Sequence, residues 1–388
     1  MECVCCKGNL SRIFTLGNQP LANKYPKEVS NFESEYIQEM NVFKCDSCGY
    51  CHVPCDADRN LFFEDYYYLS SFSGCKEHFT NLAKDLKEKG AKFVLDVGSN
   101  DGIFLKPLKD LDVKFLGVDP SHNVGEIANS KGLETMIGFF NSEIADRIIK
   151  EKGHPDVIVA CSVFTHLEDP GYFFNVCDKL LDEGGSILVE VEFLNDIIET
   201  LSFERFYYDR PHYYTVESLR EISLRYGFDA VRVDHIETHG GQLRIKFQRI
   251  RDIESKSDLS TNQFMSLSSK EILYYFGKFQ EACKELKNQL IKFKEKGVSI
   301  GGYCSPSRLS TITNFAKIGP ELLPFVIDDT PLKQGRYTPG IHIPIIPNQG
   351  SPKVENYLVF ASQYIETIRS KVPYKEVNFY KPIPFTKL

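Results

Sequence analysis

The run KFVLDVGSNDG at residues 92–102 constrains the fold more than any other part of the sequence. A short apolar run that leads into a glycine-rich bend is typical of a strand buried on both faces. The apolar runs KFLGVD, DVIVACS and SILVEV follow it. They alternate with helical patterns that close on glycine, such as HFTNLAKDLKEKG, FFNVCDKLLDEGG and VESLREISLRYG. This alternation predicts an α/β fold with a parallel sheet covered by helices on both faces.

Composition along the chain divides it into three parts. Residues 1–75 hold most of the twelve cysteines, and residues 76–260 hold the alternating strands and helices. Within the second part, DAVRVDHIE and QLRIKFQRI are joined by THGG, which predicts an antiparallel pair at the sheet edge. Residues 261–388 form the third part. We therefore expect three domains with these boundaries.

The third part begins with a long helical stripe. Ser268 and Glu271 have capping-box spacing, and Gly297 closes the pattern. The stripe packs along a domain or forms a helical dimer seam, and the sequence leaves both possible. The runs VSIGGY, LPFVIDD and NYLVFA then predict a second, smaller α/β domain. The apolar residues of the stripe are Ile272, Phe276, Phe279, Cys283, Leu286, Leu290 and Phe293.

Net charge and terminal composition exclude several classes of partner. The chain carries a net charge of −7 and no long basic run, so we expect neither nucleic acid nor an anionic membrane as partner. The start, MECVCCKGNL, lacks the apolar core of a signal peptide, and no apolar run approaches the roughly 20 residues of a membrane helix. Cysteines in such a chain indicate reduced thiols, metal ligation or burial. We expect a cytoplasmic protein.

Two cysteine pairs have metal-ligand spacing. Cys3 and Cys6 are spaced C-x-x-C, as are Cys45 and Cys48. Two such pairs can place four thiolates around Zn²⁺ in a closed structural site. The long loop between the pairs adds little cost, because loop-closure entropy grows only logarithmically with length. We predict a structural zinc with these four ligands; free buried cysteines are the alternative.

The bend after the first strand differs from a dinucleotide-binding loop. Asn100 stands at the middle position of the motif, and no third glycine follows. Asp96 at the strand end would repel a pyrophosphate but suits an ammonium group. S-adenosylmethionine has no phosphates and carries an amino acid moiety and a sulfonium. Asp119, at the end of the next strand, is placed to accept hydrogen bonds from ribose hydroxyls. A purely structural turn is the alternative.

Two further cofactor residues follow the run DVIVACS. Ligands of such sheets lie outside the carboxyl ends of the strands, where Ser162 and His166 are expected. His166 could instead pack in the core or cap a helix. The predicted cofactor residues are Asp96, Gly98, Asn100, Asp101, Asp119, Ser162 and His166.

Over nearly its whole length the chain resembles the sugar C-methyltransferase family. Members methylate a carbon next to the ketone of a nucleotide-linked deoxysugar, using S-adenosylmethionine. The resemblance implies a class I methyltransferase Rossmann-like doubly wound sheet, a small N-terminal zinc-binding domain and a C-terminal α/β substrate-binding domain. Its motifs are PLANKY (20–25), EDYYYLSSFSGCKEHF (64–79), VGSNDG, GVDPS, HGGQLR (239–244), GGYCSPSR (301–308) and VIDDTPLKQGRYTPGIHIPI (326–345).

The stretch FYYDRPHYY (206–214) departs from the family pattern of tyrosine, histidine, glutamate and histidine. Tyr207 matches the tyrosine, Tyr208 replaces the first histidine, Asp209 the glutamate and Arg210 the histidine that acts as base. Arginine stays protonated and cannot be a base at neutral pH.

A replacement base is available two residues further along. Positions i and i+2 share a face of an extended segment, so His212 could act as the base with Asp209 nearby. Arg210 would then pair with the enolate oxygen or with the phosphates. A packed aromatic loop is the alternative. The predicted catalytic residues are His212, Asp209, Tyr207, Arg210 and Tyr68.

Substrate contacts are expected from three segments. The resemblance implies Tyr66, His78 and His239. Tyr303, Ser305 and Arg308 lie on a strand-to-helix turn, where backbone donors and the guanidinium would bind a diphosphate. The family usually has lysine at position 308. The alternative is a structural turn, with the nearby acidic loop at 328–329 solvated.

The bend after the first strand and the resemblance together predict a methyltransferase that uses S-adenosylmethionine. A nucleotide-linked 4-keto deoxysugar as its substrate, in deoxysugar biosynthesis, is what the resemblance implies. Deprotonation of the carbon beside the ketone would give an enolate, which requires a base over the carbon and donors at the oxygen. One alternative is methyl transfer to a hydroxyl or another position of the sugar nucleotide. Another is a zinc-stabilised binding subunit without catalysis. We expect a monomer or a weak homodimer.

Overall fold

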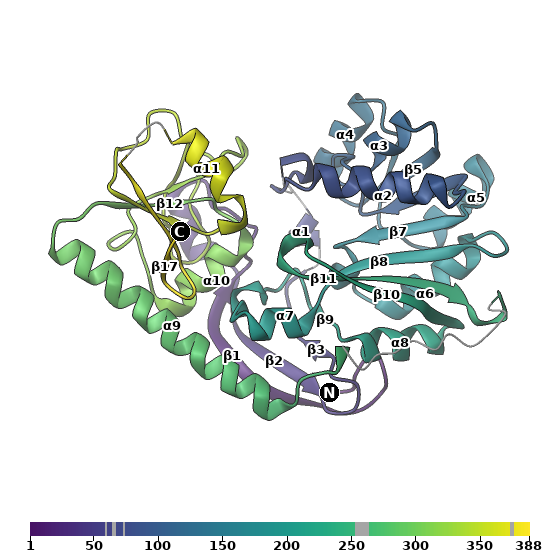
Figure 1. The fold of residues 1–388 in the computed structure, drawn as a ribbon, viewed down its shortest axis with the longest axis horizontal. Helices are drawn as coiled ribbons and strands as arrows, with labels where there is room; N and C mark the ends of the chain where they lie inside the picture. The colour runs from purple at the N-terminus through teal and green to yellow at the C-terminus, as the bar shows by residue number, and fades with distance from the viewer. Residues whose placement is uncertain (59, 64–66, 73, 253–263, 373–375) are drawn as a thin grey trace.

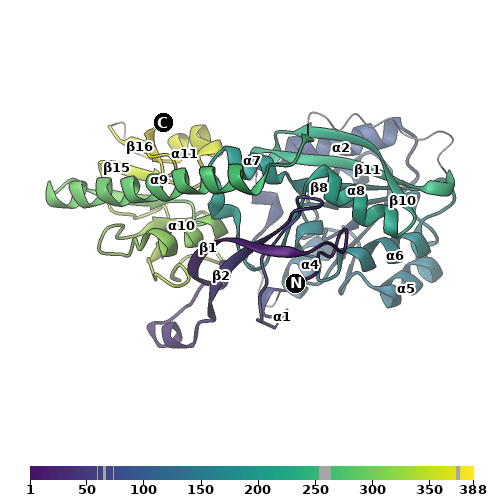
Figure 2. The same ribbon diagram turned by 90° about the horizontal axis from the view of Figure 1, so that it is seen from below.

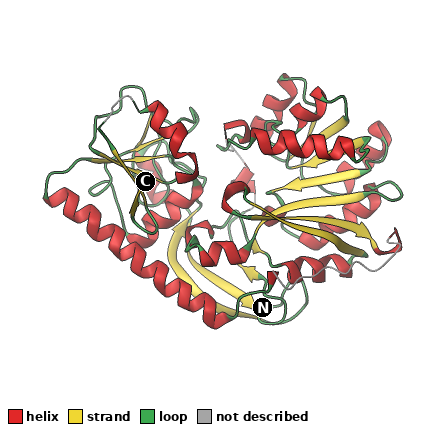
Figure 3. Cartoon of the chain, in the orientation of Figure 1, coloured by secondary structure: helices red, strands yellow, loops and turns green. Residues whose placement is uncertain are grey.

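The structure is a computed structural model that describes all 388 residues except 59, 64–66, 73, 253–263 and 373–375. Three sheets organise the chain (Figure 1). The two larger sheets lie in separate lobes, and the strands of the smallest sheet run beneath and between them, alongside a long helix, α9. Figure 3 shows the same arrangement by type of secondary structure.

The largest sheet has seven strands in the order β10-β11-β8-β7-β4-β5-β6. β8, β7, β4, β5 and β6 are parallel, whereas β11 is antiparallel to both of its neighbours. This confirms the predicted antiparallel pair at the edge and the doubly wound class I methyltransferase fold. The strands are β4 (Phe93–Val97), β5 (Lys114–Asp119), β6 (Thr135–Ile137), β7 (Val157–Cys161), β8 (Ser186–Glu192), β10 (Phe228–Ile236) and β11 (Gln242–Arg249).

Successive side chains of the inner strands point to opposite faces of this sheet, and helices cover both faces. Val94 of β4 packs with apolar residues of α2 and α3, whereas Leu95 packs on the opposite face with residues of α5, α6 and α8. α6 ends four residues before Gly184, at Leu180, because Leu181 adopts an extended backbone; the predicted glycine end was wrong. The helices are α2 (Lys76–Glu88), α3 (Leu105–Asp110), α4 (His122–Ser130), α5 (Ser142–Lys152), α6 (Pro170–Leu180) and α8 (Val216–Arg225).

The N-terminal sheet draws on two distant parts of the chain. Three of its strands are β1 (Leu10–Pro20), β2 (Ile37–Cys45) and β3 (Cys51–His52). The fourth, β9 (His212–Tyr213), comes from the aromatic stretch and pairs with β3. Leu10 packs in the core of the large sheet, and Phe14 packs with α9 and the C-terminal lobe. The expected boundary at residue 75 stays a prediction, but the N-terminal sheet shares the cores of both lobes.

The C-terminal lobe is built on a six-stranded sheet in the order β14-β13-β12-β15-β16-β17. All pairs are parallel except the last. β12 lies between β13 and β15, and α10 (Ser307–Ala316) follows it. The other elements are β13 (Val326–Ile327), β14 (Ile345–Ile346), β15 (Asn356–Val359), α11 (Ile365–Lys371), β16 (Asn378–Lys381) and β17 (Thr386–Lys387), with β12 at Ile300–Tyr303.

The long helix α9 (Ser269–Glu295) runs along one side of the molecule from the methyltransferase lobe to the C-terminal lobe (Figure 2). Ser268 and Glu271 form the predicted capping box, and Gly297 follows the helix with φ 66°. The stripe is buried against β1, α7 (Leu194–Glu199) and α10, so this chain covers its own apolar face. The described helices include none that could cross a bilayer.

Candidate functional site

A cavity of about 830 Å³ opens at the carboxyl ends of the parallel strands of the large sheet. Each part of the chain contributes to its wall. Asn23 comes from the segment after β1, Asp96 and Arg210 from the large lobe, and Arg308 from the start of α10. The cavity is therefore shared among the three parts, as expected for ligands of a doubly wound sheet.

The bend after β4 has the tight backbone that its sequence requires. Gly98, Asn100 and Gly102 have positive φ values of 74°, 50° and 86°. A Cβ atom on Gly98 would lie 2.2 Å from Cγ2 of Val163, so glycine is needed at this position. The amide of Asn100 donates to Oδ2 of Asp119 at 2.8 Å. The bend and the end of β5 are thereby held together.

Two buried carboxyl groups face the cavity at this bend. Burial, and then the charges of Asp119 and Glu190, raise the pKa of Asp96 well above its ordinary value. Burial also raises the pKa of Asp119, although hydrogen bonds from Ser121 and Asn100 oppose the effect. Within the described residues, no basic side chain forms an ion pair with Asp96 or Asp119. This end of the cavity therefore suits a cationic ligand.

Asp101 has a different position from the one predicted. It does not line the cavity; its carboxylate accepts a hydrogen bond from Ser70 Oγ at 2.7 Å and another from Ser71 Oγ. Burial raises the pKa of Asp101, but hydrogen bonds from Ser71 and Ser70 outweigh it and lower that pKa overall. Asp101 thus fastens the segment at 70–71 to the bend instead of facing a cofactor.

Ser162 and Tyr68 line the cavity. Ser162 follows β7 with φ 57°, and its Oγ accepts from Nε2 of Gln242 at 2.8 Å. The carbonyl of Tyr68 accepts from Nδ2 of Asn100 at 3.2 Å, which places the residue over the cofactor bend.

The aromatic stretch brings Tyr207, Asp209 and Arg210 to the cavity wall. Nη1 of Arg210 lies 2.5 Å from Oε1 of Glu192, and its guanidinium carbon lies 4.9 Å from the centre of the Tyr207 ring. Burial lowers the pKa of Arg210, but the charge of Glu192 and the interaction with Tyr207 raise it by more, so the pKa of Arg210 lies above its ordinary value. Oδ2 of Asp209 accepts from Nδ2 of Asn23 at 2.7 Å. Arg210 is therefore a fixed cation.

His166, predicted as a cofactor residue, lies beside this cation. Its Nδ1 is hydrogen-bonded to the carbonyl oxygen of Asp209, which can only accept, so Nδ1 carries the proton. Its Nε2 accepts from Nε of Arg210 at 3.2 Å. The ring is thus a neutral imidazole in the cavity wall, with Nε2 as its basic nitrogen.

His212, predicted to be the base, does not line the cavity. Only 2% of it is exposed, and both ring nitrogens have partners: Tyr50 Oη at Nδ1, and the carbonyl oxygen of Leu167 at 2.8 Å from Nε2. The assumption of one extended strand through Arg210 and His212 was wrong. A turn at Tyr207–Arg210 precedes Pro211, and β9 then carries His212 into the N-terminal sheet.

Of the three residues predicted at the bend after β12, only Arg308 lines the cavity. Tyr303 and Ser305 are buried and do not line it. The amide of Ser305 donates to Oδ2 of Asp328, and its carbonyl accepts from Nζ of Lys333. These residues build the turn, while the cavity wall is formed by Pro306, Ser307, Arg308 and Lys333.

The remaining predicted substrate residues are not at the cavity. His78 is held between Glu190, at 2.8 Å, and Thr238 Oγ1, at 3.0 Å, and it does not line the cavity. Its predicted role in substrate binding stays a prediction. Tyr66 and the side chain of His239 lie outside the described residues.

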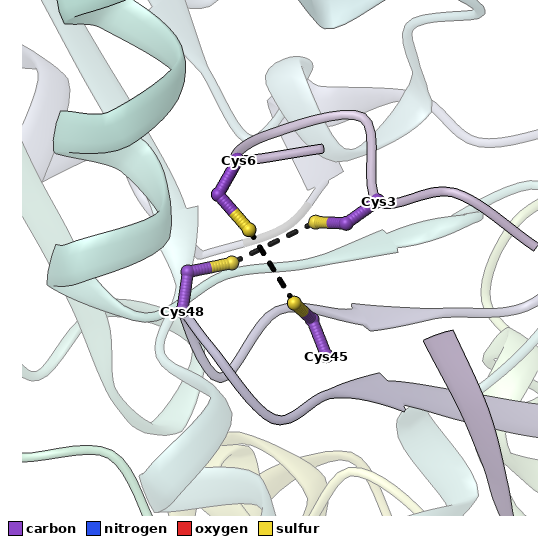
Figure 4. Close-up of side chains that lie close together, drawn as sticks. All are labelled: Cys3, Cys6, Cys45 and Cys48. Atoms are coloured by element: carbon purple, nitrogen blue, oxygen red, sulfur yellow. Dashed lines mark hydrogen bonds between the residues drawn. The ribbon is translucent and has the colours of Figure 1, made fainter. Parts of the chain in front are cut away.

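The cysteine pairs meet at the start of the N-terminal sheet (Figure 4). Sγ atoms of Cys3, Cys6, Cys45 and Cys48 all lie within 4.8 Å of one another. Two pairs are closer, with Cys3 and Cys48 at 3.6 Å and Cys6 and Cys45 at 3.4 Å. A Cβ atom on Gly8 would lie 3.2 Å from two of these sulfurs, so the turn is closed tightly over the cluster.

Two family models match consecutive parts of the chain. One, described as a methyltransferase domain, matches residues 72–233, and the other, the C-methyltransferase C-terminal domain, matches residues 237–384. C-methyltransferase NovU of Streptomyces niveus is 24% identical over 401 aligned residues, which cover 99% of this chain and 95% of that protein. The chain is an S-adenosylmethionine-dependent methyltransferase, and its C-terminal part matches the C-methyltransferase model.

Other similarities cover less of this methyltransferase. A ubiquinone biosynthesis O-methyltransferase of Caulobacter sp. (strain K31) is 32% identical over 114 residues, or 29% of this chain and 44% of that protein. The structure of magnesium protoporphyrin IX methyltransferase (ChlM) from Synechocystis PCC 6803 with bound SAM is 15% identical. It covers 50% of this chain and 99% of its own, with a TM-score of 0.38.

Sequence reasoning missed several residues of the methyltransferase cavity. Glu192 and Phe139 could have been found, because each ends or follows a buried strand at the carboxyl edge of the sheet. No local sequence pattern marks Asn23, Arg205 or Lys333 as cavity residues. Asn23 and Lys333 lie in loops and Arg205 in a short 3-10 helix, all outside the strand ends of the large sheet. The missed wall residues include Asn23, Phe139, Glu192, Arg205 and Lys333.

Proposed function

We propose that this methyltransferase transfers a methyl group to a carbon beside the ketone of a nucleotide-linked sugar. One observation carries the proposal. A single cavity contains an acidic bend, a basic bend and a histidine whose Nε2 is the basic nitrogen. These three features match a cationic methyl donor, an anionic nucleotide diphosphate and a carbon acid, respectively.

The acidic bend would hold S-adenosylmethionine. Asp96 would bind its ammonium group, and the two oxygens of Asp119 keep capacity for ribose hydroxyls beyond the backbone hydrogen bonds that they accept. Phe139 follows β6, lines the cavity and is 46% exposed, so its ring is available to the adenine. Bound S-adenosylmethionine supplies the electrophilic methyl group that the acceptor carbon takes.

The basic bend would hold the diphosphate. Arg308 lines the cavity and makes no ion pair with any described residue. Burial, and then the charge of Arg205, lower the pKa of Arg308, which an anion between the two guanidiniums would reverse. Backbone amides at the start of α10 add to this site, because a helix N-terminus favours anions.

The chemistry at the acceptor requires a base and an oxyanion partner. Nε2 of His166 would take the proton from the carbon beside the ketone, and Arg210 would stabilise the enolate oxygen. Arg210 must give up its hydrogen bond to His166 for this, while Glu192 keeps it in place. The rings of Tyr207 and Tyr68 would wall off the sugar from water.

We also propose a structural zinc ion in the cysteine cluster. Tetrahedral zinc with Zn–S bonds of ~2.3 Å requires sulfurs about 3.8 Å apart, which is close to the spacing of these four thiols. The substitution Cys45→Ser should therefore lower the zinc content of the purified protein. Cys55→Ser, in the same region but outside the cluster, is the matched control. Equal zinc in Cys45→Ser and the wild type would exclude this site.

The reaction can be tested with a panel of 4-keto sugar nucleotides. Mass spectrometry should show one added methyl group, and NMR should place it on carbon. In deuterated water, without the methyl donor, the enzyme should also exchange the proton on the same carbon. Methylation of a hydroxyl without carbon exchange would reject the proposal and favour O-methylation, which the arginine at the family's base position permits.

The base can be tested by comparing two histidines that each use Nδ1 to bond a backbone carbonyl. His166→Asn should reduce carbon exchange by about 100-fold or more, since general acid–base catalysis contributes roughly 10²–10⁴-fold. His154, bonded to the carbonyl of Leu180 outside the cavity, provides the control His154→Asn, which should exchange at the wild-type rate. Full exchange by His166→Asn would assign the base to another residue.

A further inference from the structure

Three aromatic side chains, Tyr50, His52 and His212, connect the cysteine cluster to the turn at Tyr207–Arg210. β3 follows the cluster and pairs with β9, which places His52 opposite His212. Tyr50, between Cys48 and β3, contacts both histidine rings, and all three side chains are hydrogen-bonded to each other or to the 207–213 segment. The cofactor and substrate contacts leave this arrangement without a role.

For neutral histidine rings, the hydrogen bonds along this series of side chains allow one assignment of protons. The carbonyl of Leu167 can only accept, so Nε2 of His212 donates to it at 2.8 Å. Nδ1 of His212 is then an acceptor, and the hydroxyl of Tyr50 donates to it. His52 closes the other end, with Nδ1 donating to the carbonyl of Pro211 at 3.0 Å.

This series of side chains ends beside the proposed base. The 3-10 helix η3 (Phe164–His166) ends at the proposed base, and Leu167 is the next residue. His212 donates to the carbonyl oxygen of Leu167. His166 in turn donates to the carbonyl of Asp209, three residues before His212. Each of the two histidines thus fastens the backbone next to the other, and together they lock the η3 turn to the 207–213 segment.

We propose that His212 is a positioning residue, which fixes the orientation and tautomer of His166 and is itself held by Tyr50 beside the cysteine cluster. This inference rests on the proposed role of His166. A loosened Leu167 carbonyl would let the η3 turn rotate, and the Nδ1 bond that defines the His166 tautomer would weaken. Outer partners of a reactive imidazole commonly control both properties. A displacement of about 1 Å is enough to cost roughly 100-fold in rate.

Two substitutions of His212 separate this role from simple packing. Glutamine places an N–H near the position of Nε2 and should keep the bond to Leu167, whereas asparagine is too short to reach it. We expect His212→Asn to slow carbon exchange by about 10- to 100-fold and His212→Gln by less than about 5-fold. Both variants should keep the wild-type affinity for S-adenosylmethionine, measured by calorimetry, and the wild-type zinc content.

A second readout does not depend on activity. Nitrogen-15 NMR of the imidazole rings reports which nitrogen of His166 carries the proton, with His166→Asn identifying the signal. In the wild type and His212→Gln, Nδ1 should be protonated; in His212→Asn the two tautomers should mix. If His212→Asn fails to fold, Tyr50→Phe, which removes only the hydroxyl that orients His212, should show the same changes more weakly.

The outcomes distinguish the two proposals. A wild type without carbon exchange, but with a His166 tautomer that changes in His212→Asn, would refute the proposed reaction and keep the positioning role. A wild type that exchanges, together with a His212→Asn variant of unchanged rate and unchanged His166 tautomer, would refute the positioning role and keep the reaction. Equal losses in His212→Asn and His212→Gln would also refute it, because packing alone would then explain them.

Discussion

The bends after β4 and β12 have the same backbone hydrogen bond, but the charges around them have opposite sign. Each follows an inner parallel strand, and each donates an amide to an aspartate at the end of the neighbouring strand: Asn100 to Asp119 at 2.8 Å, and Ser305 to Asp328 at 2.7 Å. Each aspartate also accepts from the amide two residues further on. One local solution therefore serves two different lobes.

The charges around the two aspartates differ. Asp328 lies 3.7 Å from Nζ of Lys333, whereas within the described residues no cation pairs with Asp119. The β4 bend adds Asp96, and the β12 bend adds Arg308. The comparison teaches that the backbone turn does not select the ligand. The charges left unpaired at each bend do, so the first favours a cation and the second an anion.

Asp119→Ala should break this comparison most strongly. Its loss leaves the amides of Asn100 and Ser121 without acceptors and removes the proposed ribose contact, so we expect the dissociation constant for S-adenosylmethionine to rise about 100-fold. Binding of a nucleoside diphosphate should not change. Calorimetry with each ligand separately measures both effects. Asp119→Asn keeps one acceptor oxygen, so its affinity for S-adenosylmethionine should lie between those of the wild type and Asp119→Ala. A matching loss of nucleotide affinity would show that the bends are not independent.

Arg308→Met is the reciprocal change at the basic bend. It keeps much of the apolar stem and removes the charge, so affinity for a nucleoside diphosphate should fall about 30-fold, as for loss of a charge-assisted contact. Affinity for S-adenosylmethionine should stay the same. Arg308→Lys, the residue usual in the family, should recover most of the binding. A methionine variant with wild-type nucleotide affinity would place the diphosphate elsewhere.

Asp96 makes the cofactor bend sensitive to pH. Its pKa is raised in the folded protein above the ordinary 3.8, so the unliganded protein loses stability as pH rises through the window above 3.8. An ammonium ligand favours the ionised form, so affinity for S-adenosylmethionine should increase with pH across the same window, by up to about tenfold per pH unit.

The substitution Asp96→Asn isolates that effect. The variant should bind S-adenosylmethionine about tenfold more weakly at neutral pH, and its affinity should no longer depend on pH in this window. Its unfolding temperature without ligand should be equal to or above that of the wild type, because a buried carboxyl is no longer forced to ionise. An unchanged pH dependence in the variant would exclude Asp96 as the titrating group.

The smallest expected difference concerns the backbone of the two bends. Gly98 has φ 74° and Cys304 has φ 65°, so both are left-handed, but only the first is glycine. Gly98→Ala should cost about 1–2 kcal/mol in unfolding free energy from conformation alone, with the contact to Val163 adding to it. Cys304→Gly should change it by less than about 1 kcal/mol, because relief of strain offsets the added chain entropy. Urea denaturation measures both, and a stable Gly98→Ala variant would remove the steric argument.

Much of the site at the large sheet was predictable from short stretches of sequence. The strand before Gly98, the aspartate that ends the next strand and the cysteine pairs each depend on neighbours within a few residues. The segment at the other side of the cavity was less predictable. His212 and His166 look equally suitable in sequence, and Tyr303 and Ser305 look as suitable as Arg308, because nothing local says which side chain faces the cavity.

The sequence by itself determined the strand and helix order, the glycine bends, the cysteine spacing and the capping of α9, since hydrophobic period and backbone sterics act over a few residues. Only the tertiary structure decided which histidine lines the cavity and which other residues form its wall. Asn23 meets Asp209 across 186 residues, and Tyr50 meets His212 across 162. Contacts of this range follow from how the three sheets pack against one another. The turn at Tyr207–Arg210 carries His212 into the N-terminal sheet, so that His166 and not His212 lines the cavity.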